Sequence, residues 1–376
     1  MGEKILFIMH LPPPVHGAAM MGQYIHDSRL INESFDCLYI NPSASNNISE
    51  VGKLNMRKFF FFFKLQYKII KALIQYKPDL CYYTPTSDGT GIYRDMLTIG
   101  LFRLFHKKFI LHFHNKGVSE YSQRPYTHWI YRRNFKKAKV ILLAKELQKD
   151  VKQFVSSDSI FFLPNGIPTT INEAEYHKVL LQRNQTKRKV RFLFLSNMLT
   201  EKGIWVLLKA CQLLKEGKRE FECHYVGNTG DVSPAYFRKS VETLGLQNQV
   251  FVHGPKYGKD KKIYFTQSDV FVFPTYYHGE TFGLVLLEAM EYGLPCISTF
   301  EGGIPSVVED AKTGFLVPQR DANVLSDKMA YFIEHPEMRS VMGDNGRKRF
   351  LSCFTIDKFE QHLRDILDSC VNKTMQ

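Results

Sequence analysis

Short, mainly apolar runs alternate along the chain with longer segments whose apolar residues recur at helical spacing. Runs of this kind are typical of strands that are buried on both faces of a parallel sheet. They form two series, and each series predicts a doubly wound α/β domain. The first series comprises residues 5–9, 80–83, 109–113, 140–143 and 160–163, and the second comprises residues 190–195, 222–226, 250–252, 270–273 and 296–298.

The boundary between the two series lies near the turn-forming segment Pro-Asn-Gly-Ile-Pro at 164–168. With 376 residues, the chain is long enough for two domains that each bury a core. We predict two Rossmann-like domains that face each other across a cleft. The predicted parts are an N-terminal domain over 1–168, an interdomain connection over the polar stretch 169–189, a C-terminal domain over 190–355, and a C-terminal helix within 356–376 that packs back toward the first domain.

Positive charge is concentrated in the first half of the chain. The net charge is +13. Residues 1–180 hold 24 Lys and Arg against 14 Asp and Glu, a net charge of +10. Most of the excess comes from residues 52–77 and 102–139. A basic surface suits nucleic acid, an anionic lipid surface or a phosphorylated acceptor, and charge alone does not choose among them.

Residues 57–71 combine five consecutive phenylalanines with cations at helical spacing, at Arg57, Lys64, Lys68 and Lys71. One interpretation is a helix that lies on an anionic membrane surface. The other is an ordinary amphipathic helix that packs its Phe side into the domain core. The phenylalanine run favours the membrane. Since no nucleic-acid recognition module accompanies the charge, we predict no nucleic-acid partner.

The rest of the composition indicates a cytoplasmic protein. No apolar stretch approaches the length that crosses a bilayer, and the short run after Lys4 lacks the features of a secretory signal. The seven cysteines occur singly, without a Cys-x-x-Cys pair or a neighbouring His at metal-ligand spacing. We therefore predict reduced thiols and no metal site.

The segment 278–290, which follows the apolar run 270–273, carries two carboxylates, Glu280 and Glu288. We expect a helix to start over 282–284, where its backbone N–H groups and dipole would form an anion site. Glu288 would lie about five residues into that helix, near a ribose diol, and Glu280 would lie across the phosphates, near a sugar. Two such glutamates are also typical of a solvated helix surface.

A dense group of glycines and apolar residues surrounds the two glutamates: Phe282, Gly283, Leu284, Ala289, Met290, Gly293, Leu294, Pro295, Gly302, Gly303 and 314–317. This pattern resembles glycosyltransferase family four, in the glycogen-synthase-like superfamily. The resemblance implies a GT-B fold, a nucleotide-diphosphate sugar as co-substrate, retention of anomeric configuration, and no metal or other cofactor. It also implies that the backbone of Phe282, Gly283 and Leu284 binds the donor, together with Glu280 and Glu288.

The resemblance extends to the start of the second series. In Thr200-Glu201-Lys202-Gly203, the family's lysine contacts the donor phosphate, so Lys202 is assigned to donor binding and, with Glu280, to catalysis. Gly254 matches the family's loop beside the nucleotide base. Asn197 stands where many members have an arginine that binds phosphate. An asparagine donates hydrogen bonds but lacks the charge and fork of a guanidinium, so donor affinity or identity is expected to differ.

Two features of the first half resemble the acceptor side of the family. The segment 12–19 resembles its proline-glycine loop, in which Gly17 would allow close backbone approach. The run 109–113 leads into His114, which resembles the family's strand-end histidine and is assigned to the catalytic site. His112 points in the same direction as His114 and remains an alternative.

The sequence thus predicts a retaining, metal-independent hexosyltransferase. It would move a sugar from a nucleotide-diphosphate sugar to a hydroxyl of a lipid-linked or growing cell-surface polysaccharide or glycolipid. Its predicted location is cytoplasmic, peripheral on the inner face of the membrane through residues 57–71. Two alternatives stay open: a non-catalytic membrane-associated scaffold whose donor site has decayed at Asn197, and a GT-B nucleotide-sugar epimerase.

Overall fold

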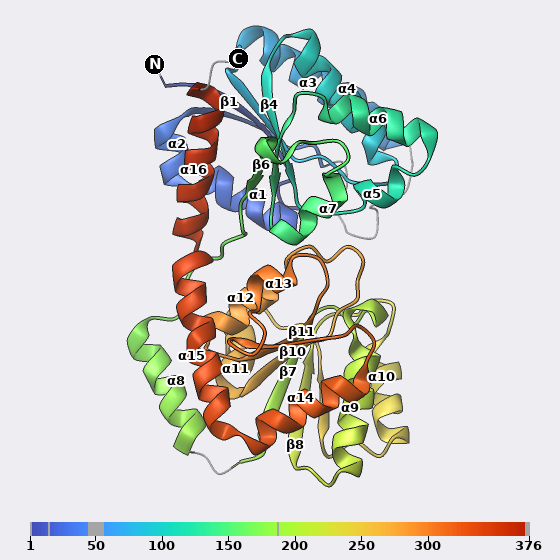
Figure 1. Ribbon diagram of the computed structural model, residues 1–376, viewed down its shortest axis with the longest axis vertical. Helices are drawn as coiled ribbons and strands as arrows, with labels where there is room; N and C mark the ends of the chain where they lie inside the picture. Colours follow the sequence, from blue (N-terminus) through green and yellow to red (C-terminus); the bar gives the residue numbers. More distant parts are fainter. Residues whose placement is uncertain (1, 14–15, 44–55, 186–187, 373–376) are drawn as a thin grey trace. The chain divides into compact units, whose positions relative to one another are not determined.

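The apolar runs of the sequence form two parallel sheets in the computed structural model of the protein, which describes residues 2–13, 16–43, 56–185 and 188–372. The chain divides into two units, residues 1–166 with 356–376 and residues 167–355. Each unit is a sheet with helices on both faces (Figure 1). The predicted pair of doubly wound α/β domains is therefore confirmed.

In the described part of the first unit, the sheet has the order β2-β1-β3-β4-β5-β6 with all neighbours parallel. The strand order reverses between β1 and β3. The sequence analysis missed β2, because this edge strand is only half-buried and its apolar pattern is weak. The strands are β1 (Lys4–Ile8), β2 (Asp36–Ile40), β3 (Leu80–Tyr83), β4 (Lys108–Phe113), β5 (Lys139–Leu142) and β6 (Ile160–Phe162).

The helices of the first unit lie on two faces because connections between parallel strands are right-handed. The chain moves one way from β1 to β2 and the other way from β2 through β5. Helices α3 (Met56–Gln75), α4 (Gly91–Leu104) and α6 (Pro125–Phe135) therefore share one face, where α4 packs against both others (Figure 1). The remaining helices are α1 (Gly17–Asp27), α2 (Arg29–Ser34), α5 (Val118–Tyr121), α7 (Gln148–Val151) and α16 (Ile356–Asn372), which packs against α2 and β4.

The described sheet of the second unit has the order β12-β11-β10-β7-β8-β9, again parallel, and its strand order reverses between β7 and β10. Its strands are β7 (Val190–Leu195), β8 (Phe221–Val226), β9 (Val250–His253), β10 (Val270–Phe273), β11 (Cys296–Thr299) and β12 (Gly314–Val317). Its helices include α9 (Ile204–Glu216), α10 (Pro234–Thr243), α11 (Gly258–Gln267), α12 (Leu284–Glu291), α13 (Ile304–Val307), α14 (Ala322–Glu334) and α15 (Pro336–Cys353).

The stretch 169–189, which we predicted as an interdomain connection, contains the helix α8 (Glu173–Gln185) and belongs to the second unit. Arg183 donates hydrogen bonds to the carbonyls of Phe265 and Tyr292, at 2.6 and 2.9 Å. Tyr176 is buried and donates to Asp344 at 2.6 Å. The prediction failed because few residues of this polar helix are buried, and they do not form an apolar stripe. Residues 186 and 187 lie outside the described part.

Three further predictions concern membranes, thiols and metals. Among the described helices, none combines the length and apolar character that a membrane span requires. All seven cysteines are free thiols, and five of them are buried. Within the described ranges, no three His, Cys, Asp or Glu side chains are grouped so that they could hold a metal ion.

Candidate functional site

The loops that follow β7 and β10 meet at the point where the strand order of the second sheet reverses. In open α/β sheets, ligands bind in the crevice at this point, outside the carboxyl ends of the strands. The backbone N–H of Tyr276 donates to the carbonyl of Glu201 at 2.8 Å. Gly203 has a φ of +86°, and a Cβ there would lie 2.1 Å from the carbonyl oxygen of Pro274. The close approach of the two loops therefore requires a glycine.

Lys202 and Glu280, one from each loop, form an ion pair at this point. The Lys202 Nζ lies 2.5 Å from Glu280 Oε2, and the two side chains are only 14% and 13% exposed. The same ammonium lies over the ring of Tyr277, 4.4 Å from its centroid. The sequence analysis proposed both residues separately, and the structure brings them together. A cation at the carboxyl edge of the sheet is well placed to compensate the charge of a phosphate.

Helix α12 begins at Leu284 and follows Gly283, whose φ of +77° favours glycine. The helix thus starts at the last residue of the predicted range 282–284, and Phe282 and Gly283 precede it. Gly283 has no side chain with which to accept hydrogen bonds from the first helical N–H groups, so these can bind an anion. The Phe282 side chain is buried and packs against Phe354, so only its backbone remains for a ligand.

Glu288, in the second turn of α12, is paired with a lysine that the sequence analysis did not identify. The Lys261 Nζ donates to both carboxylate oxygens of Glu288 at 2.7 Å. These side chains are 26% and 30% exposed, so the pair is accessible from solvent. Lys261 comes from α11, and no motif in its own segment signals the contact.

Glu291, the other described carboxylate on α12, is buried and hydrogen-bonded to the protein backbone. It is 1% exposed and accepts hydrogen bonds from the backbone N–H groups of Thr170 and Ile171. Burial raises the pKa of this carboxyl above its ordinary value. The difference between the two side chains supports Glu288, the accessible carboxylate, as the group that meets a ligand.

The other two donor residues predicted for this unit lie on loops at the same edge of the sheet. Asn197 is exposed in the loop after β7. Gly254 follows β9, and a Cβ built there would meet no atom within 4 Å. The surrounding protein therefore gives no steric reason for glycine at 254, and the roles of both residues remain predictions.

In the first unit, four histidines gather where the loops after β1 and β4 meet. His112 is fully buried, and its Nδ1 is hydrogen-bonded to the hydroxyl of Tyr82. His114 lies beside it, with ring centroids 4.1 Å apart, and is partly accessible. His10 and His16 face each other with ring centroids 6.0 Å apart. Of His112, within β4, and His114, just after it, His114 is therefore the one that a ligand can reach.

Gly17, the predicted cleft-loop glycine, is the first residue of α1 and is exposed. His16 caps this helix by accepting a hydrogen bond from the N–H of Ala19 at 3.3 Å. Pro14 and Val15, which belong to the same predicted loop, lie outside the described residues. The close backbone approach at Gly17 stays a prediction.

Burial keeps this group of histidines neutral. It is the main cause that lowers the pKa of His10 to about 3, with Arg94, His16 and His114 as lesser causes. It is also the main cause that lowers the pKa of His114 to about 4, with His16 as the lesser cause. It also lowers the pKa of His112 well below the ordinary value. At neutral pH, His114 therefore offers a neutral imidazole, which can donate or accept a hydrogen bond but carries no charge.

Acid should destabilise the first unit through these histidines. Because their pKa values are lower in the folded state, the unfolded chain binds more protons as pH falls below about 6.5. We expect each of His10 and His114 to account for about 3 kcal/mol of unfolding free energy lost by pH 4. Urea unfolding from pH 7.5 to pH 4 measures this loss. His10→Gln should reduce the dependence of the unfolding free energy on pH. The control His128→Asn, at an exposed position of the same unit, should leave that dependence unchanged. If the wild type and both variants lose the same unfolding free energy between pH 7.5 and pH 4, the buried histidines are not its source.

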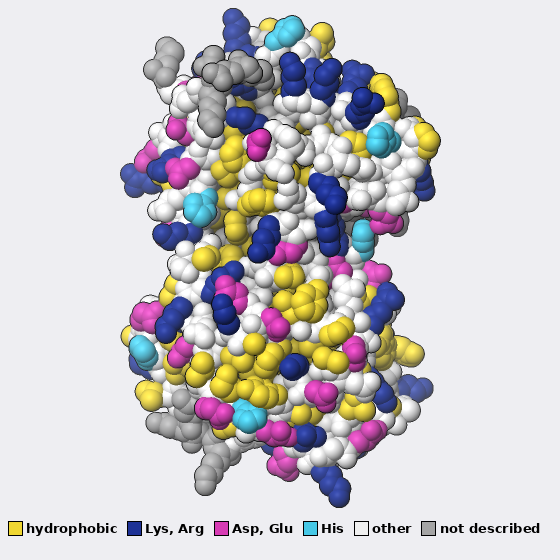
Figure 2. Space-filling model, in the orientation of Figure 1, with side chains coloured by type: hydrophobic (Ala, Val, Ile, Leu, Met, Phe, Trp, Pro, Cys, Tyr) yellow, Lys and Arg dark blue, Asp and Glu magenta, His cyan; other side chains and the backbone are white. Residues whose placement is uncertain are grey.

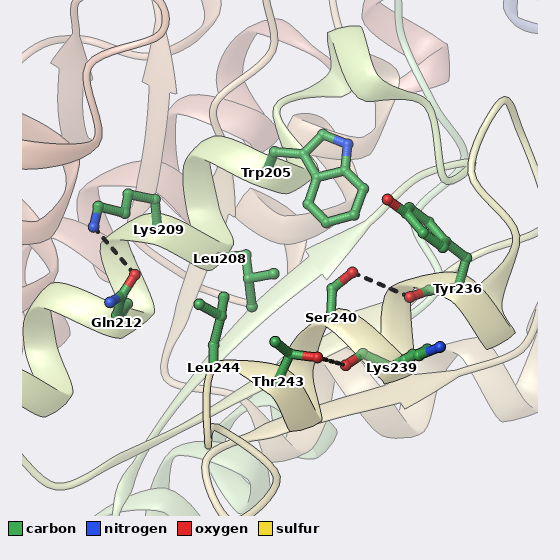
Figure 3. A pocket seen from close by; sticks show the side chains of 9 residues that line it. All are labelled: Trp205, Leu208, Lys209, Gln212, Tyr236, Lys239, Ser240, Thr243 and Leu244. Carbon is green, nitrogen blue, oxygen red and sulfur yellow. Dashed lines mark hydrogen bonds between the residues drawn. The ribbon is translucent and has the colours of Figure 1, made fainter.

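A separate surface cavity of about 540 Å³ lies between α9 and α10 (Figure 3). Its walls include Trp205 and Tyr236, whose rings meet edge to face with centroids 6.0 Å apart. The hydroxyls of Ser240 and Thr243 donate to carbonyls of their own helix. Since none of the residues predicted to bind the donor lines this cavity, it is distinct from the site at the strand reversal.

The C-terminal half of the chain matches a family model. Residues 178–349 match the glycosyl transferases group 1. The matched range contains every strand of the second unit and both ion pairs described above. The match supports a glycosyltransferase.

Curated relatives share part of their length with this chain. A putative colanic acid biosynthesis glycosyltransferase of Salmonella typhimurium is 29% identical over 188 residues, which cover 48% of this chain and 45% of the relative. The capsular polysaccharide biosynthesis glycosyltransferase CapM of Staphylococcus aureus is 26% identical over 237 residues, covering 62% and 58%. The chain thus spans less than two thirds of the length of these relatives.

Solved structures resemble nearly the whole chain. A glycosyltransferase from Rickettsia africae has a TM-score of 0.76 at 17% identity and covers 99% of this chain and 100% of its own. The Anabaena protein HepE, in complex with UDP, has a TM-score of 0.71 at 17% identity and covers 98% and 100%. These proteins have the GT-B architecture, so the predicted GT-B fold is confirmed. At this level of identity, the likeness shows the fold alone.

Proposed function

We propose that this protein is a retaining, metal-independent hexosyltransferase that uses a nucleotide-diphosphate sugar and no cofactor. Its acceptor is a hydroxyl of a lipid-linked or growing cell-surface polysaccharide or glycolipid, at the inner face of the cytoplasmic membrane. The observation that carries the proposal is the Lys202–Glu280 ion pair at the strand reversal of the second sheet. The family match and the polysaccharide-biosynthesis names of the relatives support it.

Donor binding follows from the charges at this edge. The diphosphate would lie between Lys202 and the first turn of α12, where an ammonium and backbone N–H groups oppose its charge. The ribose diol would donate hydrogen bonds to the Glu288 carboxylate. Lys261 would then either leave Glu288 or stay hydrogen-bonded to it beside the ribose. Glu280 would hold the sugar on the other side of the phosphates. UDP in the HepE structure is a nucleotide of this kind.

Catalysis would rest on stabilising the leaving group. In a front-side displacement, the bond from the anomeric carbon to the phosphate oxygen breaks while the acceptor oxygen bonds to the same face of that carbon. The departing phosphate takes the proton of the acceptor hydroxyl. Lys202 and the α12 N-terminus oppose the negative charge that grows on the diphosphate, and this effect is larger in the transition state than in the ground state. His114, as a neutral imidazole, would hydrogen-bond a sugar hydroxyl.

The scaffold alternative predicts an empty donor site, whereas the epimerase alternative predicts turnover without an acceptor. The Lys202–Glu280 and Lys261–Glu288 pairs favour an intact donor site, because a decayed site has no reason to keep four paired charges at one edge of the sheet. Product analysis with donor alone separates the epimerase from the transferase, since only the transferase requires an acceptor hydroxyl to release the nucleoside diphosphate in stoichiometric amounts.

Glu288→Gln should weaken donor binding by about 10- to 100-fold, the range for loss of a hydrogen bond to a charged group. Calorimetric titration with a panel of UDP-, GDP- and ADP-sugars measures this change and identifies the base. Glu216→Gln, at an exposed position on α9, is the matched control and should bind as the wild type does. Failure of every nucleotide sugar to bind the folded wild type would refute the proposed function.

A further inference from the structure

The outer surface of the α3-α4-α6 layer, in the first unit, has no role in the proposed reaction. The three helices are fixed to one another as well as to the sheet. Gln66 of α3 donates to Thr98 of α4 at 3.2 Å, and Arg103 of α4 donates to the carbonyls of Asn134 and Lys136 at 3.2 and 2.6 Å. The outward side chains of the three helices therefore form one surface, which we call the three-helix face.

Helix α3 turns its aromatic side outward. Its buried stripe consists of aliphatic residues, Leu65, Ile69, Ala72 and Leu73. Phe60, Phe63 and Tyr67 are 67%, 54% and 67% exposed, and Lys64, Lys68 and Lys71 lie on the same side. The hypothesis that the Phe side packs into the core is thus wrong for Phe60 and Phe63, whereas Phe61 and Phe62 are half-buried. Those of Arg57, Lys58 and Phe59 lie outside the described part.

The same pattern continues on the other two helices. On α4, Tyr93, Leu97 and Leu104 recur at helical spacing and are 45%, 47% and 71% exposed. On α6, Tyr126 and Trp129 are 50% and 55% exposed, and the guanidinium of Arg133 lies over the Trp129 ring. Because these side chains adjoin each other across three helices, they form an apolar patch rather than scattered exposed residues.

The charge of this face has one sign. Across α3, α4 and α6, the only acidic residue in the sequence is Asp95, which is 1% exposed and paired with Arg94. Lys and Arg side chains gather over this region, with hydrophobic side chains among them (Figure 2). The exposed cations among the described residues here include Lys64, Lys68, Lys71, Arg132, Arg133, Lys136 and Lys137.

We propose that the three-helix face docks on an anionic membrane surface. The cations match lipid phosphates, while Phe, Tyr, Trp and Leu side chains enter the boundary between headgroups and acyl chains. Aliphatic residues such as Leu97 and Leu104 favour lipid over nucleic acid, since they neither stack on bases nor contact phosphates. The docking surface stands on its own geometry, and in the proposed function it would bring the enzyme to a lipid-borne acceptor.

Co-sedimentation of the full chain with vesicles of phosphatidylglycerol and phosphatidylcholine tests the proposal. We expect binding that weakens as salt rises from about 0.1 to 1 M and that is absent with phosphatidylcholine alone. Lys64→Gln/Lys68→Gln/Lys71→Gln should lower the partition coefficient by about 100-fold, at about fivefold for each lysine near the surface. Leu104→Ser/Trp129→Ser should also lower it, which a purely electrostatic contact would not predict.

The control is the variant Lys178→Gln/Lys209→Gln/Lys239→Gln, which removes the same charge from exposed positions of the second unit. It should bind vesicles within about twofold of the wild type, because these lysines lie on α8, α9 and α10 of the second unit and are not part of the three-helix face. The proposal would be overturned if both triple variants lost vesicle binding equally. It would also be overturned if the wild type bound polyuridylate and not vesicles. Donor binding is measured without lipid, so that result leaves the proposed donor site and transfer reaction standing and removes only the membrane location.

Discussion

Lys202→Met should lower kcat for sugar transfer by about 100- to 1000-fold, the usual effect of removing one group that stabilises developing negative charge. The ammonium lies 2.5 Å from Glu280, a residue of the loop that leads into α12, and in the proposed function the departing diphosphate gains charge beside it. Because this charge grows as the bond breaks, the loss should fall on kcat more than on KM. Initial rates of nucleoside diphosphate release measure both constants.

The matched control for this variant is Lys209→Met, at an exposed position of α9 whose lysine donates only to Gln212 among the bonds described here. It should keep the wild-type kcat. Lys202→Met also leaves the largely buried Glu280 carboxylate without its cation, so thermal unfolding is recorded alongside activity. The double variant Lys202→Met/Glu280→Gln should recover thermal stability and remain inactive. Recovery of activity with stability would show that Lys202 is structural.

Gly203→Ala should destabilise the second unit by about 3 kcal/mol, the sum expected for a left-handed backbone without glycine and for overpacking. A methyl group there would lie 2.1 Å from the Pro274 carbonyl oxygen, so the loops after β7 and β10 would have to separate. The unfolding midpoint should fall by roughly 6 to 12 °C. Donor binding should weaken as well, because Lys202 and Glu280 are held by these two loops.

Gly254→Ala provides the control for this strain. Its φ is not left-handed and a Cβ would meet no protein atom within 4 Å, so the unfolding midpoint should stay within about 1 °C of the wild type. If Gly254 lies beside the nucleotide base, as we predict, donor binding should weaken without loss of stability. An unchanged midpoint for Gly203→Ala would contradict the packing of the two loops.

The fold was largely predictable because both sheets are parallel and buried. Their strands read as apolar runs, and the alternation with helices indicates two doubly wound domains. Strand β2 escaped prediction because an edge strand with half-buried residues has no such run. Helix α8 escaped it because its contacts depend on two polar side chains, Tyr176 and Arg183, whose partners are far away in sequence.

The candidate site was predictable where a motif marks it and not where the fold creates it. Glu280, Glu288 and Lys202 stand in recognisable local patterns, and the strand reversal explains why loops 78 residues apart meet. Lys261 has no local signal, because its partner Glu288 lies on another helix. The exposure of Phe60 and Phe63 on α3 was also undecidable from the sequence, since a buried aliphatic stripe and an exposed aromatic stripe have the same period.

A crystal structure with a bound nucleoside diphosphate tests the central claim most directly. The account predicts the phosphates between the Lys202 ammonium and the N–H groups of Leu284 and Val285, with the ribose hydroxyls on Glu288. A nucleotide bound elsewhere, with the Lys202–Glu280 and Lys261–Glu288 pairs unchanged, would contradict it.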